Sequence, residues 1–356
     1  LIYDEAMMTA REMVCQNPPA QTISFHEDGS AAEDFEALIV GFGATGRAAL
    51  HYLILNGMFD GSDFCADVFA SDCDAVSGCI MNRCPNLEDE FKVRFHNANA
   101  KSHEFFRFLQ NHYKNLNYIV LCCGEEENEE LSREISKYLR FNGRDLPVYS
   151  LTKTGFKSRR LHEAVPDSWQ LYSSDLLLSE RSDKLAMAYN HYYCQGNGKT
   201  LQENWFNCDS FSRDSSRAAA DFMSSMLITV GLDEAEVLKN GLNLTAEQEL
   251  TLAKTEHLRW CAFHLMNGYT LMTDEEFQER SQRYLKEKAM GADKLTRISK
   301  NSLNRTHACL IDWNELDTLS TKENAVTGGS VNYKQADINN IHVIPEALKL
   351  AQEDLA

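Results

Sequence analysis

The sequence contains no apolar stretch long enough to cross a bilayer. It also lacks an excess of positive charge, because 35 Lys and Arg face 53 Asp and Glu and give a formal net charge of −18. Nucleic-acid phosphates would be repelled by such a chain, so we expect no nucleic-acid partner. We expect a cytoplasmic location, either as a free protein or as the cytoplasmic part of a membrane protein whose membrane domain lies upstream of Leu1.

Metal-binding and disulfide patterns are missing as well, although the sequence has 11 cysteines. Cys73, Cys79 and Cys84 have neither Cys-x-x-Cys spacing nor a neighbouring histidine. Cys122 and Cys123 lie in an apolar run that is typical of a strand. We therefore expect reduced, mostly buried cysteines and no bound metal. No Ser-Tyr-x-x-x-Lys or comparable catalytic array is present, which favours a binding protein over an enzyme.

The most informative stretch is a glycine-rich turn between an apolar run at 37–40 and a helical pattern at 45–55. Gly41, Gly43 and Gly46 form Gly-x-Gly-x-x-Gly. In dinucleotide-binding folds the first glycine makes the tight turn, the second admits a pyrophosphate and the third lets helix pack on strand. The alternative is that the glycines serve packing only. The predicted nucleotide-binding residues here are Gly41, Phe42, Gly43, Ala44, Thr45 and Gly46.

An acidic residue at the end of the second strand would hold a ribose hydroxyl. Residues 64–71 form a plausible strand and Asp72 follows it directly, with Asp74 as the close competitor. The alternative for both is an ordinary turn residue. An acid here favours NAD(H), another adenine dinucleotide or an ADP-ribose compound over NADP, because it repels a 2′-phosphate.

Strand and helix patterns continue to alternate through residue 152. Further strands are expected at 93–97, 118–124 and 146–152, and helices at 102–113 and 125–141. This alternation predicts an α/β fold with a doubly wound parallel sheet. Ligands bind such sheets at the carboxyl ends of the strands, which places the glycine turn, Asp72, Asn97 and Gly124 on one rim.

The segments around these strands carry weaker patterns. Residues 1–14 have helical spacing without a start cap, as if continuing an upstream element. Residues 74–85 are expected to form a loop, and residues 169–172 a sixth strand. The basic segment 153–160 is expected to be a solvated loop, with a contact to a ligand phosphate as the alternative.

This half resembles the Trk potassium-uptake regulatory domain, the Rossmann nucleotide-binding domain of RCK-type channel regulators. The matching segments are 38–46, Asp72, 96–98 and 120–124, and the resemblance runs from about residue 35 to 152. It implies a Rossmann-type domain that binds a nucleotide and regulates ion transport.

The second half has helical patterns only, at 211–229, 246–267 and 277–288. Residues 195–199 are the most linker-like segment. We therefore divide the chain into an N-terminal helix and linker (1–32), a nucleotide-binding domain (33–194) and a mainly α-helical domain (195–356).

A cluster of polar and aromatic residues marks the helix at 246–267. Trp260 falls on its broadest apolar face and is expected in the core. Glu256, His257 and Arg259 beside it form either a polar network between helices or part of a ligand pocket. His257 and His264 are seven residues apart, which is not zinc spacing.

Together with residues 307–316 and 337–344, this helix resembles the RyR domain, the repeat named for ryanodine receptors and found also in bacterial proteins. The matching residues are Leu252, Ala253, His257, Trp260, Gly268, Tyr269, Trp313 and Leu316. The resemblance runs from about 250 to 350. It implies a small helical module for recognition and assembly, with Glu256, His257, Arg259, Trp260 and Trp313 as its recognition residues.

These observations predict a cytoplasmic nucleotide-sensing region that binds NAD(H) or an ADP-ribose-like ligand. The RyR-like module would relay the ligand's presence to an upstream element, such as a membrane ion-transport domain, and the chain would form a homo-oligomer. One alternative is an NAD-dependent oxidoreductase, with His96 as a candidate acid or base. Another is an assembly protein whose Rossmann fold is vestigial.

Overall fold

The computed structural model describes residues 4–159, 183–194 and 198–353. A six-stranded sheet in the order β3-β2-β1-β4-β5-β6 organises the first half. Its strands are β1 (Phe35–Val40), β2 (Phe64–Ala70), β3 (Val93–Asn97), β4 (Leu116–Leu121), β5 (Val148–Thr152) and β6 (Gly155–Arg159). The first five are parallel and β6 pairs antiparallel with β5. The predicted α/β class with a mostly parallel sheet is confirmed.

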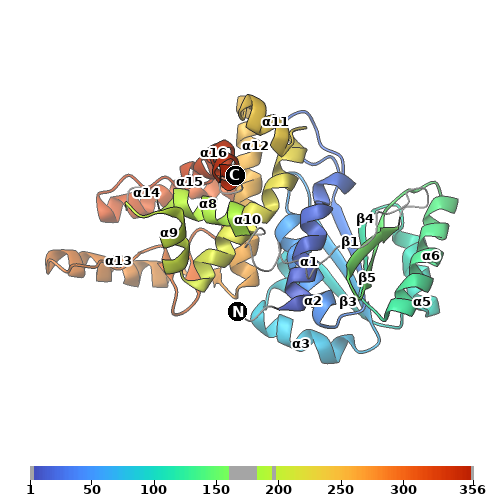
Figure 1. Cartoon of the computed structure of the whole chain (residues 1–356). Helices are drawn as coiled ribbons and strands as arrows, with labels where there is room; N and C mark the ends of the chain where they lie inside the picture. The colour runs from blue at the N-terminus through green and yellow to red at the C-terminus, as the bar shows by residue number, and fades with distance from the viewer. Residues whose placement is uncertain (1–3, 160–182, 195–197, 354–356) are drawn as a thin grey trace.

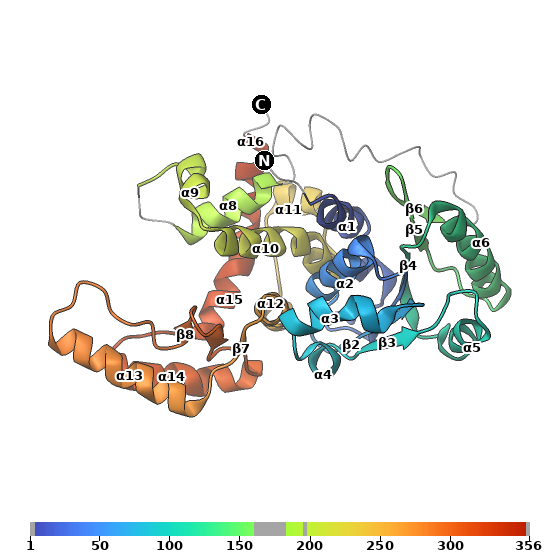
Figure 2. The same cartoon turned by 90° about the horizontal axis from the view of Figure 1, so that it is seen from below.

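Both faces of the sheet are covered, because side chains of β1 alternate between two cores. Ala37 and Ile39 pack with α2, whereas Leu38 and Val40 pack with α5 and α6. Figure 2 shows the sheet between α1, α2 and α3 on one side and α5 and α6 on the other. The helices of this half are α1 (Glu5–Gln16), α2 (Ala44–Asn56), α3 (Cys73–Arg83), α4 (Leu87–Glu90), α5 (His103–His112) and α6 (Glu125–Phe141).

The second half is mainly helical, as predicted, with one small sheet in the order β7-β9-β8. In Figures 1 and 2, α13 and α14 run side by side and extend away from the body of the molecule. The elements are α8 (Lys184–Tyr193), α9 (Leu201–Asn207), α10 (Ser210–Thr229), α11 (Glu234–Asn240), α12 (Ala246–Met266), β7 (Thr270–Leu271), α13 (Asp274–Ala289), β8 (Lys300–Asn301), β9 (Thr306–His307), α14 (Leu316–Thr327), α15 (Tyr333–His342) and α16 (Ile344–Glu353).

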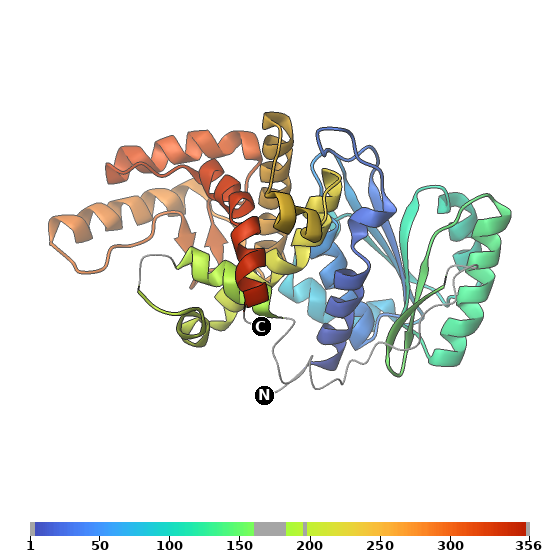
Figure 3. The same cartoon turned by 45° about the horizontal axis from the view of Figure 1, so that its top comes forward.

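The two halves share one apolar core. Helices α10 and α12 pack directly on α2, and Figure 3 shows these yellow and orange helices against the blue ones. The rings of Phe59 and Phe222 have centroids 6.0 Å apart. Next to them, Lys254 Nζ lies 3.1 Å from Asp60 Oδ2, and the hydroxyl of Thr255 accepts the Asp60 N–H at 3.1 Å.

Two segments expected to be loops are regular elements. Residues 74–85 mostly belong to α3, whose buried residues Cys73, Ser77 and Ile80 have helical spacing. This face is built from small and polar side chains, so it lacks the apolar periodicity that predicts a helix. The basic segment 153–160 contains β6, which pairs with β5 through a tight turn. The sixth strand expected at 169–172 lies outside the described residues.

The start of the first half also differs from expectation. The side chain of Asp4 caps α1 by accepting the Met7 N–H at 3.1 Å, so the helix does have a start cap. Helix α8 packs on α9, α10 and α16, so a boundary after residue 194 separates it from the helices that it contacts. No helix within the described ranges is long and apolar enough to span a membrane.

Candidate functional site

The first and third glycines of the turn between β1 and α2 are required by the protein itself. Gly41 has φ +88°, and a Cβ there would lie 2.7 Å from the carbonyl carbon of Cys122. A Cβ on Gly46 would lie 2.1 Å from the carbonyl oxygen of Gly41. Gly41 is therefore required where the turn packs against the residues after β4. Gly46 is required where α2 packs against the turn.

Gly43 is different, because no neighbour among the described residues requires a glycine there. It precedes α2 with φ −67° and ψ −163°, a conformation open to any residue. It is exposed, and a Cβ there would meet no described atom within 4 Å. Ala44 is also exposed and Thr45 is half-buried. The free space over Gly43 is the position that a pyrophosphate occupies in dinucleotide-binding turns.

Phe42 anchors the turn rather than facing the open side. Its side chain is buried and its ring packs on Phe95 with a centroid distance of 5.4 Å. Its carbonyl oxygen accepts a hydrogen bond from Arg47 Nη1 at 3.2 Å. Only the backbone of Phe42 is therefore available to the predicted nucleotide.

Electrostatics distinguish the two long helices that begin at this rim. The first turn of α2 carries no acidic residue and is followed by Arg47, so its N-terminal N–H groups favour an anion. Helix α6 begins with Glu125, Glu126 and Glu127 directly after Gly124. These three carboxylates already complement the helix dipole and would repel a phosphate. An anionic group is therefore favoured at α2 and disfavoured at α6.

The other predicted rim residues all follow the carboxyl ends of parallel strands. Asp72 precedes α3, is exposed, and makes no side-chain hydrogen bond to the part of the chain that the structure describes. Asp74, its competitor, is exposed in the first turn of α3. Asn97 ends β3 with an exposed side chain, and Gly124 precedes α6 with no described atom within 4 Å of a Cβ.

A buried carboxylate within the sheet was not predicted. Asp67, in the middle of β2, is 1% exposed and accepts hydrogen bonds from Arg94 at 2.9 and 2.5 Å. His96 Nε2 lies 2.6 Å from the same carboxylate, and the His96 ring stacks on Phe69. Burial opposes ionisation, but the hydrogen bonds from His96 and Arg94 outweigh it and lower the pKa of Asp67. His96, the candidate acid or base, is thus already bound to a carboxylate.

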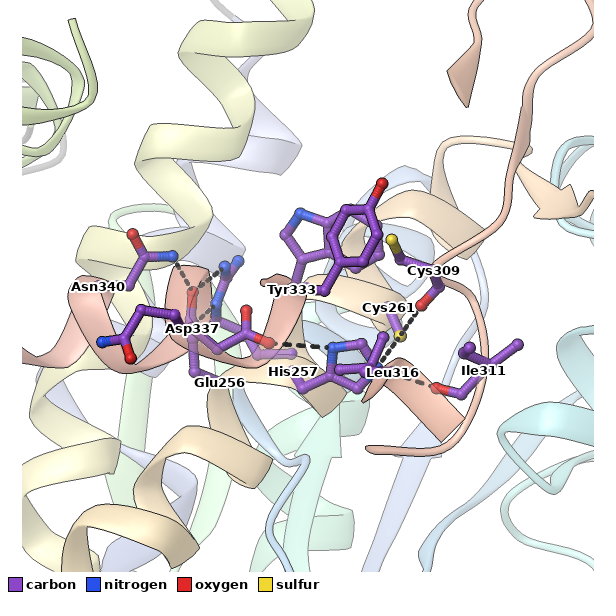
Figure 4. A network of polar contacts seen from close by, with 12 residues as sticks. Glu256, His257, Cys261, Cys309, Ile311, Leu316, Tyr333, Asp337 and Asn340 are labelled. Carbon is purple, nitrogen blue, oxygen red and sulfur yellow. Dashed lines mark hydrogen bonds and ion pairs between the residues drawn. The ribbon is translucent and has the colours of Figure 1, made fainter. Parts of the chain in front are cut away.

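In the helical half, α12 carries a buried polar network (Figure 4). Arg259 donates two hydrogen bonds of 2.7 Å to the carboxylate of Glu256. Asn340 of α15 donates a third, at 3.1 Å. The Nη1 atom of Arg259 is buried and has no hydrogen-bond partner among the described residues. The ion pair therefore ties α12 to α15 and leaves one donor unused.

His257 forms the second part of the network. Its Nε2 lies 2.9 Å from the carbonyl oxygen of Ile311, and its Nδ1 lies 3.2 Å from Asp337. A carbonyl oxygen only accepts, so with Asp337 ionised both ring nitrogens donate. Burial opposes the charged ring, but the hydrogen bonds to Asp337 and Cys261 outweigh it and raise the pKa of His257 to about 11.

The side chains of Cys261, His257 and Asp337 form a chain of contacts, with the histidine between the thiol and the carboxylate, as in nucleophilic cysteine sites. The Cys261 thiol lies 3.5 Å from His257 Nε2. His257 Nε2 already donates its proton in the shorter hydrogen bond to the Ile311 carbonyl oxygen. It therefore has no lone pair free to accept the thiol proton. The arrangement therefore serves as a structural network.

Trp260 is half-buried, packs against the main apolar core and also borders a cavity of about 420 Å³. Its ring has a centroid 4.0 Å from that of His264 and 4.8 Å from that of His307. Burial lowers the pKa of His264 to about 3 and that of His307 to about 2, so both rings are neutral. Trp260 therefore lies at the edge of the core and not fully inside it. Helix α12 is buried on most of its sides, so it has no single apolar face that would place one residue at the centre.

The structure brings the five predicted RyR-type residues together. Glu256 and Arg259 pair with each other, and the ring of His257 lies between those of Trp260 and Trp313, at 6.0 and 5.9 Å. Trp313 is buried, with Lys334 over its ring. Only Trp260 and His257 line the cavity itself.

Comparisons with protein-family models, with curated proteins and with solved structures found no match to this chain. The resemblances to the Trk-type and RyR domains therefore remain predictions. Within the described residues, no group of three or more His, Cys, Asp or Glu is placed to hold a metal ion.

Proposed function

We propose that this chain is a nucleotide-binding regulatory protein with a Rossmann-type first half. The turn from Gly41 to Gly46 binds the pyrophosphate of NAD(H) or of an ADP-ribose compound, and Asp72 holds a ribose hydroxyl. The observation that carries this proposal is the open, unstrained position of Gly43 at the start of α2. A ligand that approaches the backbone explains the absence of a side chain there, whereas packing does not.

The sheet order supports the same position. β1 lies between β2 and β4, so the connections leaving β1 and β4 run to opposite sides. Open α/β sheets bind ligands at this switch point, outside the carboxyl ends of the strands. The start of α2 lies at this point and carries no acidic residue, whereas the start of α6 carries three glutamates that repel an anion. The anionic part of the ligand is therefore expected at α2.

The contacts of α2 supply a route from this ligand to the helical half. α10 and α12 pack on α2, and Asp60, after the end of α2, is bonded to Lys254 and Thr255 of α12. A ligand that orders the start of α2 therefore acts on a helix that touches the RyR-like module. That module relays the signal to a further copy of the chain or to an upstream element.

Calorimetric titration with NAD⁺, NADH and ADP-ribose tests the proposal. The wild-type protein should bind at least one of them, and Gly43→Val should lose that binding because the valine fills the pyrophosphate position. Gly78→Val is the matched control, since Gly78 is exposed on α3 and also has no described atom within 4 Å of a Cβ. Equal affinity in the wild type and in Gly43→Val, with both folded, would overturn the assignment.

A further inference from the structure

A second hollow, distinct from the glycine turn, lies where the two halves meet. It has a volume of about 900 Å³ and is bordered by the end of α3, the start of α10, the turn after α12, α13 and the segment 297–305. Five basic side chains line this basic hollow: Arg83, Arg280, Arg297, Lys300 and Arg305. Such a concentration of positive charge is unexpected in a chain with a net charge of −18.

None of the five basic side chains forms an ion pair with a carboxylate in the part of the chain that the structure describes. Arg280 donates to main-chain carbonyl oxygens of Arg297, Ile298 and Lys300, and Arg305 to that of Asn267. The acceptors are neutral carbonyl groups, so these hydrogen bonds orient the guanidinium groups without adding negative charge.

The two acidic residues at the border offset this charge only in part, because Asp209 attracts Lys300 but forms no ion pair with it. Asp209 caps α10 by accepting the N–H of Ser212 at 2.9 Å. Asp214 pairs with Arg217 at 2.9 Å. The hydrogen bonds of Asp209 and the ion pair of Asp214 are thus made to groups outside the five basic side chains.

The wall of the hollow is held in place by close contacts. Gly268 has φ +76°, and a Cβ there would lie 2.9 Å from the carbonyl oxygen of Arg83, so backbone meets backbone at this point. Lys300 Nζ lies over the rings of Phe211 and Tyr269, at 4.6 and 5.2 Å from their centroids. Burial and the nearby Arg297 lower the pKa of Lys300 more than Asp209 raises it, and a bound anion would favour the charged ammonium by attraction.

We propose that the basic hollow binds a small molecule that carries two or more phosphate groups. Its volume lies in the range of small-molecule sites. Arginine forks bind phosphate oxygens in pairs, and five basic side chains without an ion pair among the described residues match more than a single phosphate. This site goes beyond the proposed nucleotide turn and uses none of its residues. Arg83 also borders a smaller cavity with Ala44 and Arg47 at the start of α2, whereas Arg280, Arg297, Lys300 and Arg305 do not line that cavity.

Titration with tripolyphosphate, pyrophosphate and inorganic phosphate tests the site. The affinity should rise with the number of phosphates and fall steeply with added salt. The double variant Arg83→Gln/Arg305→Gln should bind tripolyphosphate at least about 100-fold more weakly, because each lost charge-assisted hydrogen bond is worth about tenfold or more. The control Lys137→Gln/Arg140→Gln, which removes two exposed charges from α6, should stay within about twofold of the wild type.

The Gly43→Val variant separates this site from the glycine turn. Tripolyphosphate binding should persist in Gly43→Val and be lost in Arg83→Gln/Arg305→Gln, with the melting temperature of each variant checked first. If binding is instead lost in Gly43→Val and kept in the arginine variant, the phosphates bind at the turn and the basic hollow is not a site. Equal binding in the arginine variant and in its control would overturn the proposal, whatever the outcome for nucleotides.

Discussion

Glu256 and Arg259 form an ion pair with two hydrogen bonds of 2.7 Å, and each side chain is 2% exposed. The pair lies on α12, beside Trp260. The sequence predicted a core tryptophan flanked by polar recognition residues. In the structure Arg259 is the more deeply buried of the two, and Trp260 packs at the edge of the core beside a cavity.

Arg259→Ala should therefore destabilise the protein by about 3–5 kcal/mol, because it leaves the Glu256 carboxylate buried without its partner. Trp260→Ala should cost less, since part of that side chain is already exposed. Urea unfolding of both variants gives the comparison. The double variant Glu256→Ala/Arg259→Ala should lose less than the sum of the single variants. A larger loss for Trp260→Ala than for Arg259→Ala would contradict this interpretation.

The His257–Asp337 pair should make stability fall at alkaline pH. The pKa of His257 is about 11 in the folded protein and about 6.5 in an unfolded chain. A raised pKa contributes stability that is fully present below about pH 6.5 and is lost as the pH rises toward 11. Asp337→Asn removes the partner, so its free energy of unfolding should change less between pH 7 and pH 10. Parallel pH profiles for the wild type and this variant would count against the pair.

The buried neutral histidines predict the opposite behaviour in acid. The pKa of His264 is lowered to about 3 and that of His307 to about 2, mainly by burial. Lowered values contribute stability that is present above about pH 6.5 and is lost as the pH falls. His264→Phe removes one such group, so stability should fall less steeply between pH 6 and pH 4.5, by up to about 1.4 kcal/mol per pH unit. An unchanged slope would show that His264 is protonated in the folded protein.

Substitutions at two glycines of the turn should differ in their effect on stability, because packing requires Gly46 and does not require Gly43. Gly46→Ala should destabilise the protein by about 1–3 kcal/mol or more, because its Cβ would lie 2.1 Å from the Gly41 carbonyl oxygen. Gly43→Ala should change the free energy of unfolding by less than about 1 kcal/mol. Thermal unfolding of both variants measures this. A large loss of stability in Gly43→Ala would mean that packing does require this glycine.

Asp72 should select against a 2′-phosphate. Asp72→Ala should weaken NAD⁺ or ADP-ribose binding by about tenfold to a hundredfold, the range for a charge-assisted hydrogen bond. The same variant should bind NADP⁺ more tightly than the wild type does, because the repelling carboxylate is gone. Asp74→Ala is the control and should change neither affinity. Equal losses for both dinucleotides in Asp72→Ala would remove Asp72 from the site.

The sequence predicted the elements whose patterns are local. The apolar run before Gly41, the helix after Gly46 and the strand before Asp72 all lie where their spacing placed them. Helix α3 was not predicted, because Ser77 and Cys73 on its buried face do not produce the repeat of large apolar residues that indicates a helix. Strand β6 was not predicted, because Phe156 is the buried residue of a segment that is otherwise basic, and its burial depends on the pairing with β5.

The polar contacts and the basic hollow could not be predicted from the sequence, because they depend on which helices and strands become neighbours in the fold. Asp67 meets Arg94 and His96 only because β2 and β3 pair in one register. Arg259 is buried because α10 and α15 both pack on α12, which no periodicity within α12 reveals. The basic hollow is assembled from segments as distant as Arg83 and Arg305, so its charge is invisible along the chain.

The shared core has a consequence for how the chain comes apart. Phe59 and Phe222, from opposite sides of the predicted boundary, belong to one buried cluster with Phe35 and Phe263. Cutting the chain near residue 195 would expose this cluster in both fragments. We expect neither fragment to stay folded by itself, and intact protein to melt in a single calorimetric transition whose van't Hoff and calorimetric enthalpies agree.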